Sequence, residues 1–591
     1  MPKNNNFDAA LTEKGCVGGF GGIDCRGRAC AAKNALADIR NLRLLSDGTL
    51  RSRSGYTHAA ALQSEPRAIM TDFEDGEPVL YTLCGDSVFR IEPDGTNYVV
   101  SYLNTESGDA AIFRHGDAIY AIDGLELYRK LPDDEDFDAV SGYVPLYGDG
   151  WDPLTGGKVA EPLNFLSRNY RIRFLTGKNG ADQVAFRLPF ALVNSVYVNG
   201  ASVTAASVGI TSASGDGSPI SASLPPDSEI VFGLSLPWDD YHRSDVTSCV
   251  SALSVGELSD ERICCFGGTN CGEMFFTRPV TDAQLAESQK LFPYSSSIYF
   301  PSTSRVTFGE GRHPIRSVCR YYNRQLVFTS GDAWVMNWDG KEDDPKVYLP
   351  WIRRISPSLG ASDSLATISF DGGVMTFSGR TFFRWSSSSE IATRFSALPV
   401  SENIAQILPE NISGKVSGAV DEEWGEVLFS FSDDSEGRCF VWNYRLGAWY
   451  VFTGIYADRI FRWGKNIAFI RGKDLFVFDD SAVCDTDEDG SYPIPVNITS
   501  DWLDFGHPET IKKGVWVMLR HGGSPLTVTL SDSFGCERKA VMGGPGSRSA
   551  APLEGYAEDR IDIGSFRFLR CSVSSDGSSP VTLRGLCLAA D

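Results

Sequence analysis

Residues 459–480 read RIFRWGKNIAFIRGKDLFVFDD. Three hydrophobic runs alternate here with two turn-forming segments: 459–463, Gly464-Lys465-Asn466, 467–471, Gly472-Lys473 and 475–478. Short hydrophobic runs separated by glycine-containing turns are typical of antiparallel hairpins. The stretch therefore predicts a meander of three strands, and such a unit is too small to bury both of its faces alone.

The same pattern of strand and turn recurs along most of the chain. Further copies lie at 67–100, 109–131, 315–340, 364–386 and 417–452, with a weaker one around 262–277. About seven small units that each need neighbours on both faces are best packed radially, as the blades of a β-propeller. A series of β-sandwiches is the alternative, but it would show longer strands and less regular spacing.

The remaining segments divide an all-β chain into five parts. The expected divisions are a Gly-, Asn- and Ala-rich N-terminal arm at 1–35, a first propeller part at 36–154, an inserted small β-domain at 155–255, a second propeller part at 256–484 and a C-terminal β-sandwich at 485–591. The arm has no hydrophobic period, so we expect it to order only against a neighbour. The segment from Ala35 to Leu45 is expected to supply the strand that closes the propeller.

Composition excludes several classes of protein. The chain of 591 residues has 59 Gly, 29 Pro and 35 Phe, which suits many short strands and disfavours a helical bundle. Its net charge of −22 opposes tight binding of DNA. No segment reaches the roughly 18–20 consecutive apolar residues of a membrane span. The 14 cysteines include no C-x-x-C pair, and the N-terminus lacks a signal-like apolar segment, so we expect synthesis in a reducing cytosol.

One acidic segment has the start of a calcium-binding loop. Asp485, Asp487 and Asp489 precede Gly490 in the pattern D-x-D-x-D-G, which places carboxylates at loop positions 1, 3 and 5. Position 12 is Val496, so the bidentate acid that completes such a loop is absent. An acidic, solvated linker between domains is the favoured interpretation, with calcium at these three residues as the alternative.

Other candidate sites have simpler explanations. Ser432, Asp434 and Gly437 only partly match the Asp-box turn of sialidase propellers. A group of aromatic residues resembles a carbohydrate platform, but blade core is the favoured interpretation: Trp442, Trp449, Phe452 and Trp463. Two cysteine groups lack zinc-site spacing and are expected to be free thiols: Cys16, Cys25 and Cys30, and Cys264, Cys265 and Cys271. No catalytic constellation stands out, so we expect no enzymatic activity and no cofactor other than the calcium alternative.

Three motifs resemble a known family. Asn41 and Arg43 form an N-x-R strand, and the segment from Gly48 to Tyr56 follows the pattern G-x-L-x-x-R-x-G-Y. The segment from Tyr444 to Trp449 is similar to a Y-x-x-G-x-W hairpin, and Asp501 to Gly506 with Lys512-Lys513 resembles the start of a C-terminal sandwich. Together they resemble the tail nozzle (tail tubular protein B, or tail hub) family of short-tailed bacteriophages.

The resemblance implies a structural protein of the virion, assembled in the cytoplasm of the host bacterium. It implies a homo-oligomeric ring, a hexamer, that continues the DNA channel below the portal and adaptor and anchors tail fibres. Double-stranded DNA would pass an acidic wall without being held. Two alternatives stay open: a receptor-binding adhesin whose propeller binds glycan, and a sialidase-like glycan hydrolase.

Overall fold

The computed structural model describes most of the chain. The described residues are 16–18, 20–26, 34–152, 155–177, 184–186, 192–210, 220–256, 261–338, 349–387, 395–410, 412, 414–523, 525–542 and 556–590. Most of the expected N-terminal arm, including Cys30, lies outside them. Within them, no helix is long and apolar enough to cross a membrane.

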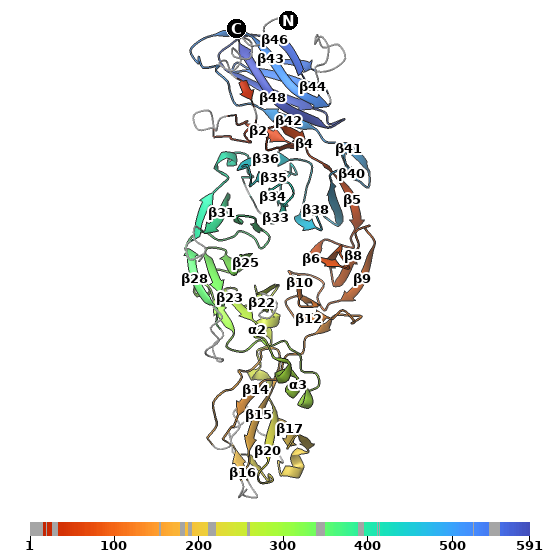
Figure 1. Cartoon of the computed structure of the whole chain (residues 1–591), viewed down its shortest axis with the longest axis vertical. Helices are drawn as coiled ribbons and strands as arrows, with labels where there is room; N and C mark the ends of the chain where they lie inside the picture. Colours follow the sequence, from red (N-terminus) through yellow and green to blue (C-terminus); the bar gives the residue numbers. More distant parts are fainter. Residues whose placement is uncertain are drawn as a thin grey trace.

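In the described residues, six four-stranded antiparallel sheets and the first four strands of a nine-stranded sheet form the seven blades of a β-propeller (Figure 1). Blades 1–4 contain, in order, β6 (Pro66–Glu74), β7 (Glu77–Cys84), β8 (Ser87–Ile91) and β9 (Asn97–Tyr102); β10 (Ala111–His115), β11 (Ala118–Ile122), β12 (Leu127–Lys130) and β13 (Asp138–Ala139); β21 (Ser251–Val255), β22 (Arg262–Phe266), β23 (Glu273–Phe276) and β24 (Arg305–Thr307); and β25 (Ile315–Tyr321), β26 (Arg324–Thr329), β27 (Ala333–Asn337) and β28 (Trp351–Ser356). Each of the seven repeats expected from the sequence lies in one of the seven blades.

The other three blades complete the ring. Blades 5–7 contain β29 (Thr367–Phe370), β30 (Gly373–Ser378), β31 (Thr381–Ser387) and β32 (Phe395–Pro399); β33 (Val416–Asp421), β34 (Glu426–Phe431), β35 (Cys439–Asn443) and β36 (Ala448–Phe452); and β37 (Arg459–Trp463), β38 (Asn466–Arg471), β39 (Asp474–Asp479) and β5 (Gly55–Ala61). The two turns of blade 7 place Gly464 and Gly472 at φ of 62° and 61°, a conformation that glycine adopts without steric cost.

Hydrophobic clusters between neighbouring blades hold the ring together. The middle strands β11, β34 and β35 are buried at every position, because another blade covers each face, and this explains their mostly hydrophobic sequences. A cluster containing Leu80 of blade 1 and Ile470 of blade 7 joins the first and last blades. The ring is therefore closed by side-chain packing as well as by strand pairing.

The closing strand differs from the prediction. β5 pairs with β39 from Gly55↔Asp479 to Ala61↔Asp474, so an N-terminal strand completes the last blade and covers its outer edge. The segment expected to close the ring, 35–45, instead forms β2 (Asp38–Arg40) and β3 (Leu42–Leu44), which join other sheets. The prediction named the wrong segment, because several adjacent segments have similar hydrophobic patterns.

The insertion lies between blades 2 and 3. Its elements are β14 (Leu146–Asp149), β15 (Asn169–Leu175), β20 (Glu229–Ser235), β17 (Leu192–Val198) and β18 (Ala201–Val203) in one sheet, β16 (Val184–Phe186) with β19 (Ile220–Ala222), and the short helices η1 (Ala205–Val208), η2 (Trp238–Asp240) and α2 (Ser244–Thr247). The expected boundaries at 155 and 255 need correction. β14 pairs with β15 and belongs to the insertion, whereas β21 pairs with β22 and belongs to blade 3.

A helix from blade 3 packs on this insertion. α3 (Asp282–Leu291) lies between β23 and β24. The Ser288 hydroxyl donates to the Val144 carbonyl at 3.0 Å, and the Tyr197 hydroxyl donates to the Leu291 carbonyl at 3.0 Å. These contacts attach the insertion to the propeller at a second point, beyond its two chain connections.

The C-terminal part is a sandwich of two sheets. Its strands are β42 (Val496–Thr499), β43 (Lys512–Gly523), β44 (Leu526–Asp532), β45 (Glu537–Met542), β46 (Tyr556–Phe566), β47 (Leu569–Ser575) and β48 (Val581–Ala590), joined by β1 (Cys16–Gly18), β3 and β4 (Leu50–Ser52). The expected division of the N-terminal region is therefore wrong in two respects: β3 and β4 belong to the sandwich, and β1 of the expected arm pairs with β48 of its own chain.

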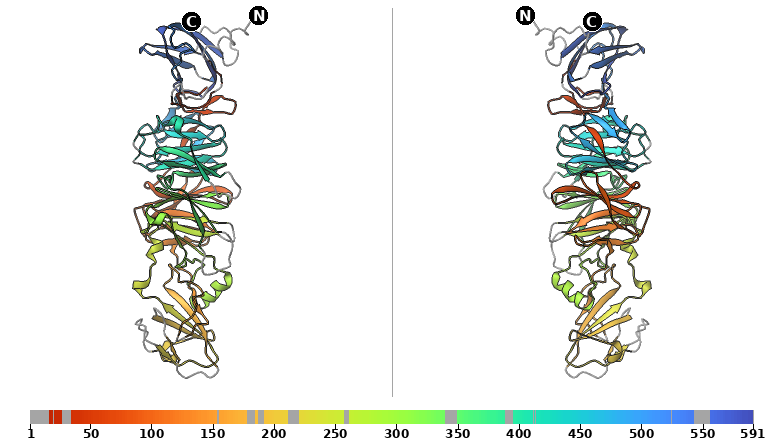
Figure 2. Two further views of the ribbon diagram at one scale, coloured as in Figure 1. Left: turned by 90° about the vertical axis from the view of Figure 1, so that its left-hand side faces the viewer. Right: turned by 90° about the vertical axis from the view of Figure 1, so that its right-hand side faces the viewer.

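The three bodies form an elongated molecule. The sandwich, with β1 and β48, lies at one end, the propeller in the middle, and the insertion at the other end (Figures 1 and 2). A short hairpin of β40 (Cys484–Asp487) and β41 (Gly490–Pro493) precedes β42 at the expected start of the C-terminal domain. The remaining described helices are η4 (Gly309–Gly311) and η5 (Glu402–Ile404).

Candidate functional site

One continuous sheet crosses from the propeller into the sandwich. Its nine strands run in the order β33-β34-β35-β36-β2-β42-β47-β44-β45. β2 is the connecting strand: Arg40 pairs in parallel with Val451 of blade 6, and Ile39 pairs antiparallel with Ile498 of the sandwich. Main-chain hydrogen bonds thus join the two bodies directly, so neither can turn against the other without breaking the sheet.

Asn41 follows β2 and connects its own segment to three other parts of the chain. It is buried and adopts a φ of 57°, in the left-handed region that Asn tolerates better than most residues. Its Nδ2 donates to the Thr453 hydroxyl and the Pro495 carbonyl, both at 2.8 Å. Its Oδ1 accepts from the Thr453 amide at 2.7 Å and from Arg53 Nε at 3.0 Å. The side chain therefore uses its donor and acceptor atoms to hold blade 6, the β41–β42 connection and Arg53 together.

Arg53 and Asp485 form a buried ion pair beside Asn41. Arg53 Nη1 and Nη2 donate to the two carboxylate oxygens of Asp485 at 2.8 Å and 2.7 Å. Asp485 Oδ1 also accepts from the Tyr56 amide at 3.3 Å, and Arg53 Nη2 also donates to the Thr453 carbonyl at 3.1 Å. The side chains are 1% and 9% exposed, and this geometry with both charges hydrogen-bonded is the one in which burial of an ion pair is tolerated.

Arg43 occupies a second buried position at the junction. Its Nε lies 3.3 Å from Glu426 Oε1, and its guanidinium lies 4.6 Å from the centre of the Trp424 ring. Burial raises the pKa of Glu426, and the attraction of Arg43 opposes that rise without cancelling it. Asp421 is affected in the same way, by burial first and Arg43 second. Arg43 therefore lies beside two acids whose pKa values are raised, so that both bind a proton more readily than exposed carboxyl groups do.

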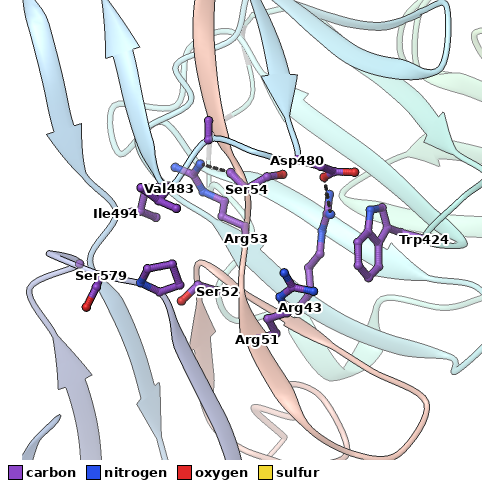
Figure 3. Close-up of a pocket in the computed structure, with 13 residues that line it drawn as sticks. Arg43, Arg51, Ser52, Arg53, Ser54, Trp424, Asp480, Val483, Ile494 and Ser579 are labelled. Atoms are coloured by element: carbon purple, nitrogen blue, oxygen red, sulfur yellow. Dashed lines mark hydrogen bonds and ion pairs between the residues drawn. The ribbon is translucent and has the colours of Figure 1, made fainter. Parts of the chain in front are cut away.

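These arginines line a small cavity between the propeller and the sandwich. The cavity has a volume of about 280 Å³, and its lining includes Arg43, Arg51 and Arg53, with Asp480 and Trp424 beside Arg43 (Figure 3). Arg43 Nη1 lies 3.8 Å from Asp480 Oδ1. We name the set Asn41, Arg43, Arg53, Glu426 and Asp485 the junction cluster.

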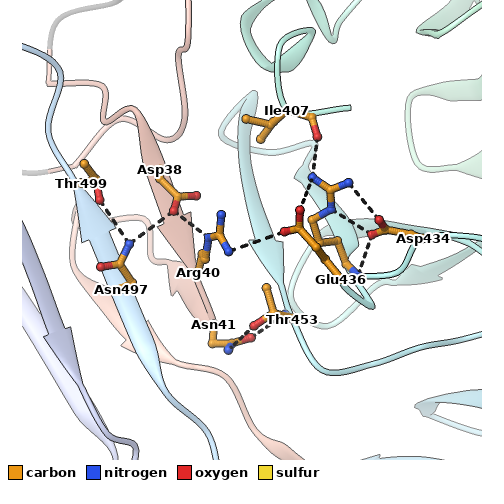
Figure 4. A network of polar contacts seen from close by, with 10 residues as sticks. Asp38, Arg40, Asn41, Ile407, Asp434, Glu436, Thr453, Asn497 and Thr499 are labelled. Atoms are coloured by element: carbon orange, nitrogen blue, oxygen red, sulfur yellow. Dashed lines mark hydrogen bonds and ion pairs between the residues drawn. The ribbon is translucent and has the colours of Figure 1, made fainter. Parts of the chain in front are cut away.

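A charged network covers the flank of β2 (Figure 4). Arg40 Nε donates to Asp38 Oδ2 at 2.7 Å, and Arg40 Nη1 lies 3.8 Å from Glu436. Arg438 donates to both carboxylate oxygens of Asp434 at 2.9 Å. Burial alone would raise the pKa of Asp434, but the hydrogen bonds from Arg438 lower it. Asp434, one residue of the partial Asp-box match, is thus held by an arginine on its own turn.

The three residues of the calcium alternative have different surroundings. Asp485 is buried against Arg53, so it is part of the propeller junction and not of a solvated linker. Asp487 Oδ1 accepts from the Asp489 and Gly490 amides at 3.0 Å and 3.2 Å within the β40–β41 turn. Among the described residues, these three carboxylates do not form a group whose ligand atoms lie within 4.8 Å of one another.

The other sequence candidates are explained by burial. Trp442, Trp449, Phe452 and Trp463 are all buried, which confirms blade core over a carbohydrate platform. The described cysteine side chains form no disulfide, and burial raises the pKa of Cys264 to about 12. The junction cluster as a whole was not predicted, although its member Asp485 was among the predicted calcium residues. Three of its residues, Asn41, Arg43 and Arg53, lie in the N-x-R and G-x-L-x-x-R-x-G-Y motifs, which indicated only the family resemblance.

A second cavity opens at the axis of the propeller. It has a volume of about 460 Å³, and all seven blades contribute residues near the starts of their inner strands. The charged residues in its lining are Arg67, Asp109, Arg316, Asp363, Lys415 and Arg459. Among the described residues, no ion pair within 4 Å joins these six side chains. Burial lowers the pKa of Arg459 and of Arg67, as expected for cations in a partly desolvated cavity.

No protein-family model matches the chain, and no curated protein matches it. Among solved structures, YCF48 from Cyanidioschyzon merolae is similar, with 9% identity and a TM-score of 0.33 over 72% of this chain and 98% of that chain. Virginiamycin B lyase from Staphylococcus aureus is similar with 8% identity and a TM-score of 0.35 over 71% of this chain and 96% of that chain. Similarity at such low identity concerns the fold alone.

Proposed function

We propose that this chain is a structural component of a short-tailed phage virion, in which copies form a ring that continues the DNA channel of the tail. The observation that carries the proposal is the continuous nine-stranded sheet, reinforced by the junction cluster. A protein that transmits load between neighbouring rings needs bodies that keep one fixed orientation. A sheet shared by two bodies, with a buried ion pair beside it, supplies that rigidity.

The motifs that suggested the family also support this proposal. Asn41, Arg43 and Arg53 are the motif residues, and all three are used for the junction between propeller and sandwich. Gly55 of the same motif has no room for a side chain, since an added Cβ would lie 1.9 Å from the Cys484 carbonyl oxygen. The resemblance therefore rests on residues with an architectural role.

The charge of the chain is consistent with a channel for DNA. A net charge of −22 repels phosphate, so a wall built from this protein would let a duplex pass without retaining it. We propose a ring that contacts an adaptor on one side and carries tail fibres on the other. The elongated protomer offers three separate bodies for these contacts and for those between copies.

Negative-stain imaging of purified protein, alone and mixed with phage tails that lack it, tests this proposal. We expect rings with an axial opening, and incorporation of the rings into the tails. An Arg53→Met variant is expected to form fewer rings, whereas the Arg312→Met variant, altered at an exposed position, should assemble normally. A protein that stays monomeric in all mixtures would contradict the proposal.

A receptor-binding protein is the second candidate function. The axial cavity favours it, because four cations and two carboxylates give its lining a net positive charge in a strongly acidic chain. Such a lining suits a glycan that carries carboxylate groups. We would test binding of acidic and neutral oligosaccharides to the protein and to an Arg316→Ala, Lys415→Ala variant. Preferential binding of acidic sugars that the variant loses would support this candidate.

A further inference from the structure

Three metal-ligating side chains meet at the edge of blade 7. His58 lies on the closing strand β5, Asp474 begins β39, and Glu488 lies in the turn between β40 and β41. His58 Nε2 lies 3.6 Å from Asp474 Oδ1 and 3.6 Å from Glu488 Oε1. The ligand atoms of all three residues lie within 4.8 Å of one another.

The distances and burial of these atoms point to a shared ion. His58 Nε2 and Asp474 Oδ1 are inaccessible to solvent, and neither has a hydrogen-bond partner. The 3.6 Å separations exceed the usual range for a hydrogen bond, whose donor and acceptor lie about 2.7–3.2 Å apart. Two ligand atoms on one tetrahedral zinc ion lie about 3.4 Å apart, given bonds near 2.1 Å. The spacing thus suits a common ion better than a direct contact.

We propose that His58, Asp474 and Glu488 bind one first-row divalent transition-metal ion such as Zn²⁺. One imidazole nitrogen and two carboxylate oxygens form a ligand set for this class, whereas calcium prefers oxygen ligands alone. The fourth position is open to water. Glu488 comes from the acidic segment that suggested calcium, but it is the one acid there that the D-x-D-x-D-G pattern does not count.

The ion would fasten the closing strand of the propeller. β5 joins blade 7 from a distant part of the chain, and its edge pairs only with β39 in that sheet. A metal held by β5, β39 and the β40–β41 turn adds a link among three segments at the seam of the ring. Because the ligands are assembled only in the folded state, the ion stabilises that state in proportion to its binding.

Titration with Co²⁺ after chelator treatment tests the site, because the spectrum identifies the ligands. We expect one Co²⁺ per chain with weak visible bands and without the near-ultraviolet band of thiolate ligation, which separates this site from the free cysteines. Zn²⁺ should displace Co²⁺ and raise the melting temperature. Glu488→Gln alters a side chain that is 64% exposed and should weaken Co²⁺ binding by about tenfold or more without unfolding the protein.

Two variants serve as matched controls. Asp489→Asn removes the neighbouring acid, and His507→Gln removes a histidine whose side chain is 71% exposed, so both should bind Co²⁺ like the parent protein. The proposal is overturned if the parent protein binds no stoichiometric Co²⁺, or if Glu488→Gln leaves its affinity unchanged. It is also overturned if added Zn²⁺ leaves the melting temperature unchanged.

Discussion

Arg53 and Asp485 are 432 positions apart in the chain, yet two hydrogen bonds of 2.8 Å and 2.7 Å join their side chains in the interior. Arg53 lies between a strand of the sandwich, β4, and the closing strand of the propeller, β5. Asp485 begins the passage from the last blade back to the sandwich. The chain passes between the sandwich and the propeller at both of these places, and the ion pair joins the two connecting segments.

Removal of one partner of this pair should be strongly destabilising. Arg53→Met leaves the carboxylate of Asp485 buried without its cation, and we expect a loss of about 3–5 kcal/mol in the free energy of unfolding. Urea unfolding followed by tryptophan fluorescence measures the loss.

The double variant Arg53→Met, Asp485→Leu should recover part of this stability, because it leaves no uncompensated charge. Arg312→Met is the control, since Arg312 and Glu310 form an ion pair with side chains 75% and 79% exposed. It should change the stability by less than about 1 kcal/mol. Equal losses in the Arg53 and Arg312 variants would show that the buried pair has no special role.

The fold was more accessible to sequence reasoning than the junction. The blades repeat a local pattern of strand and glycine turn, as in 459–480, and local patterns are visible without any knowledge of partners. The junction depends on contacts such as Asn41 to Thr453, which are 412 positions apart. No spacing rule predicts which of many polar residues meet over such distances. For the same reason, the sequence did not indicate that β5, and not a strand within 35–45, closes the propeller.

A side chain at Gly55 should disturb the same junction. In Gly55→Ala the new Cβ would lie 1.9 Å from the Cys484 carbonyl oxygen, which belongs to the backbone and cannot rotate away. We expect a loss of about 1–3 kcal/mol or more, as for other overpacked sites. Gly522→Ala is the matched control, because an added Cβ there meets no atom within 4 Å. Thermal unfolding of both variants gives the comparison, and a normal melting temperature for Gly55→Ala would refute this account of the motif glycine.

The stability contributed by Glu426 should depend on pH in an unusual direction. Burial raises the pKa of this carboxyl in the folded protein, so the folded state binds its proton more tightly than the unfolded state does. Stability is therefore lost as pH rises from the ordinary glutamate range through the raised pKa. Relative to Glu426→Gln, the parent protein should become less stable over this window, as measured by urea unfolding at a series of pH values.

Asp434→Asn is the control, because the stability contributed by Asp434 should change with pH in the opposite direction. Burial alone would raise the pKa of Asp434, but hydrogen bonds from Arg438 lower it overall, so the carboxylate stabilises the fold above its ordinary range and loses this effect as pH falls through the lowered pKa. The difference between parent and Asp434→Asn should thus shrink in acid. Glu426→Gln and Asp434→Asn with the same pH dependence would contradict the assigned directions.

Native thiol reactivity should separate the buried cysteines from the others. Burial raises the pKa of Cys439 and of Cys571 to about 12, so at pH 8 they are both inaccessible and protonated, and the thiol form is a poor nucleophile. Cys484 is partly exposed. With a maleimide, followed by digestion and mass spectrometry, we expect Cys484 to be modified long before Cys439 and Cys571. Urea should make all 14 thiols reactive, and this control shows that each peptide is detectable. Modification of Cys439 at the rate of Cys484 in the native protein would mean that blade 6 opens far more readily than its packing against blades 5 and 7 allows.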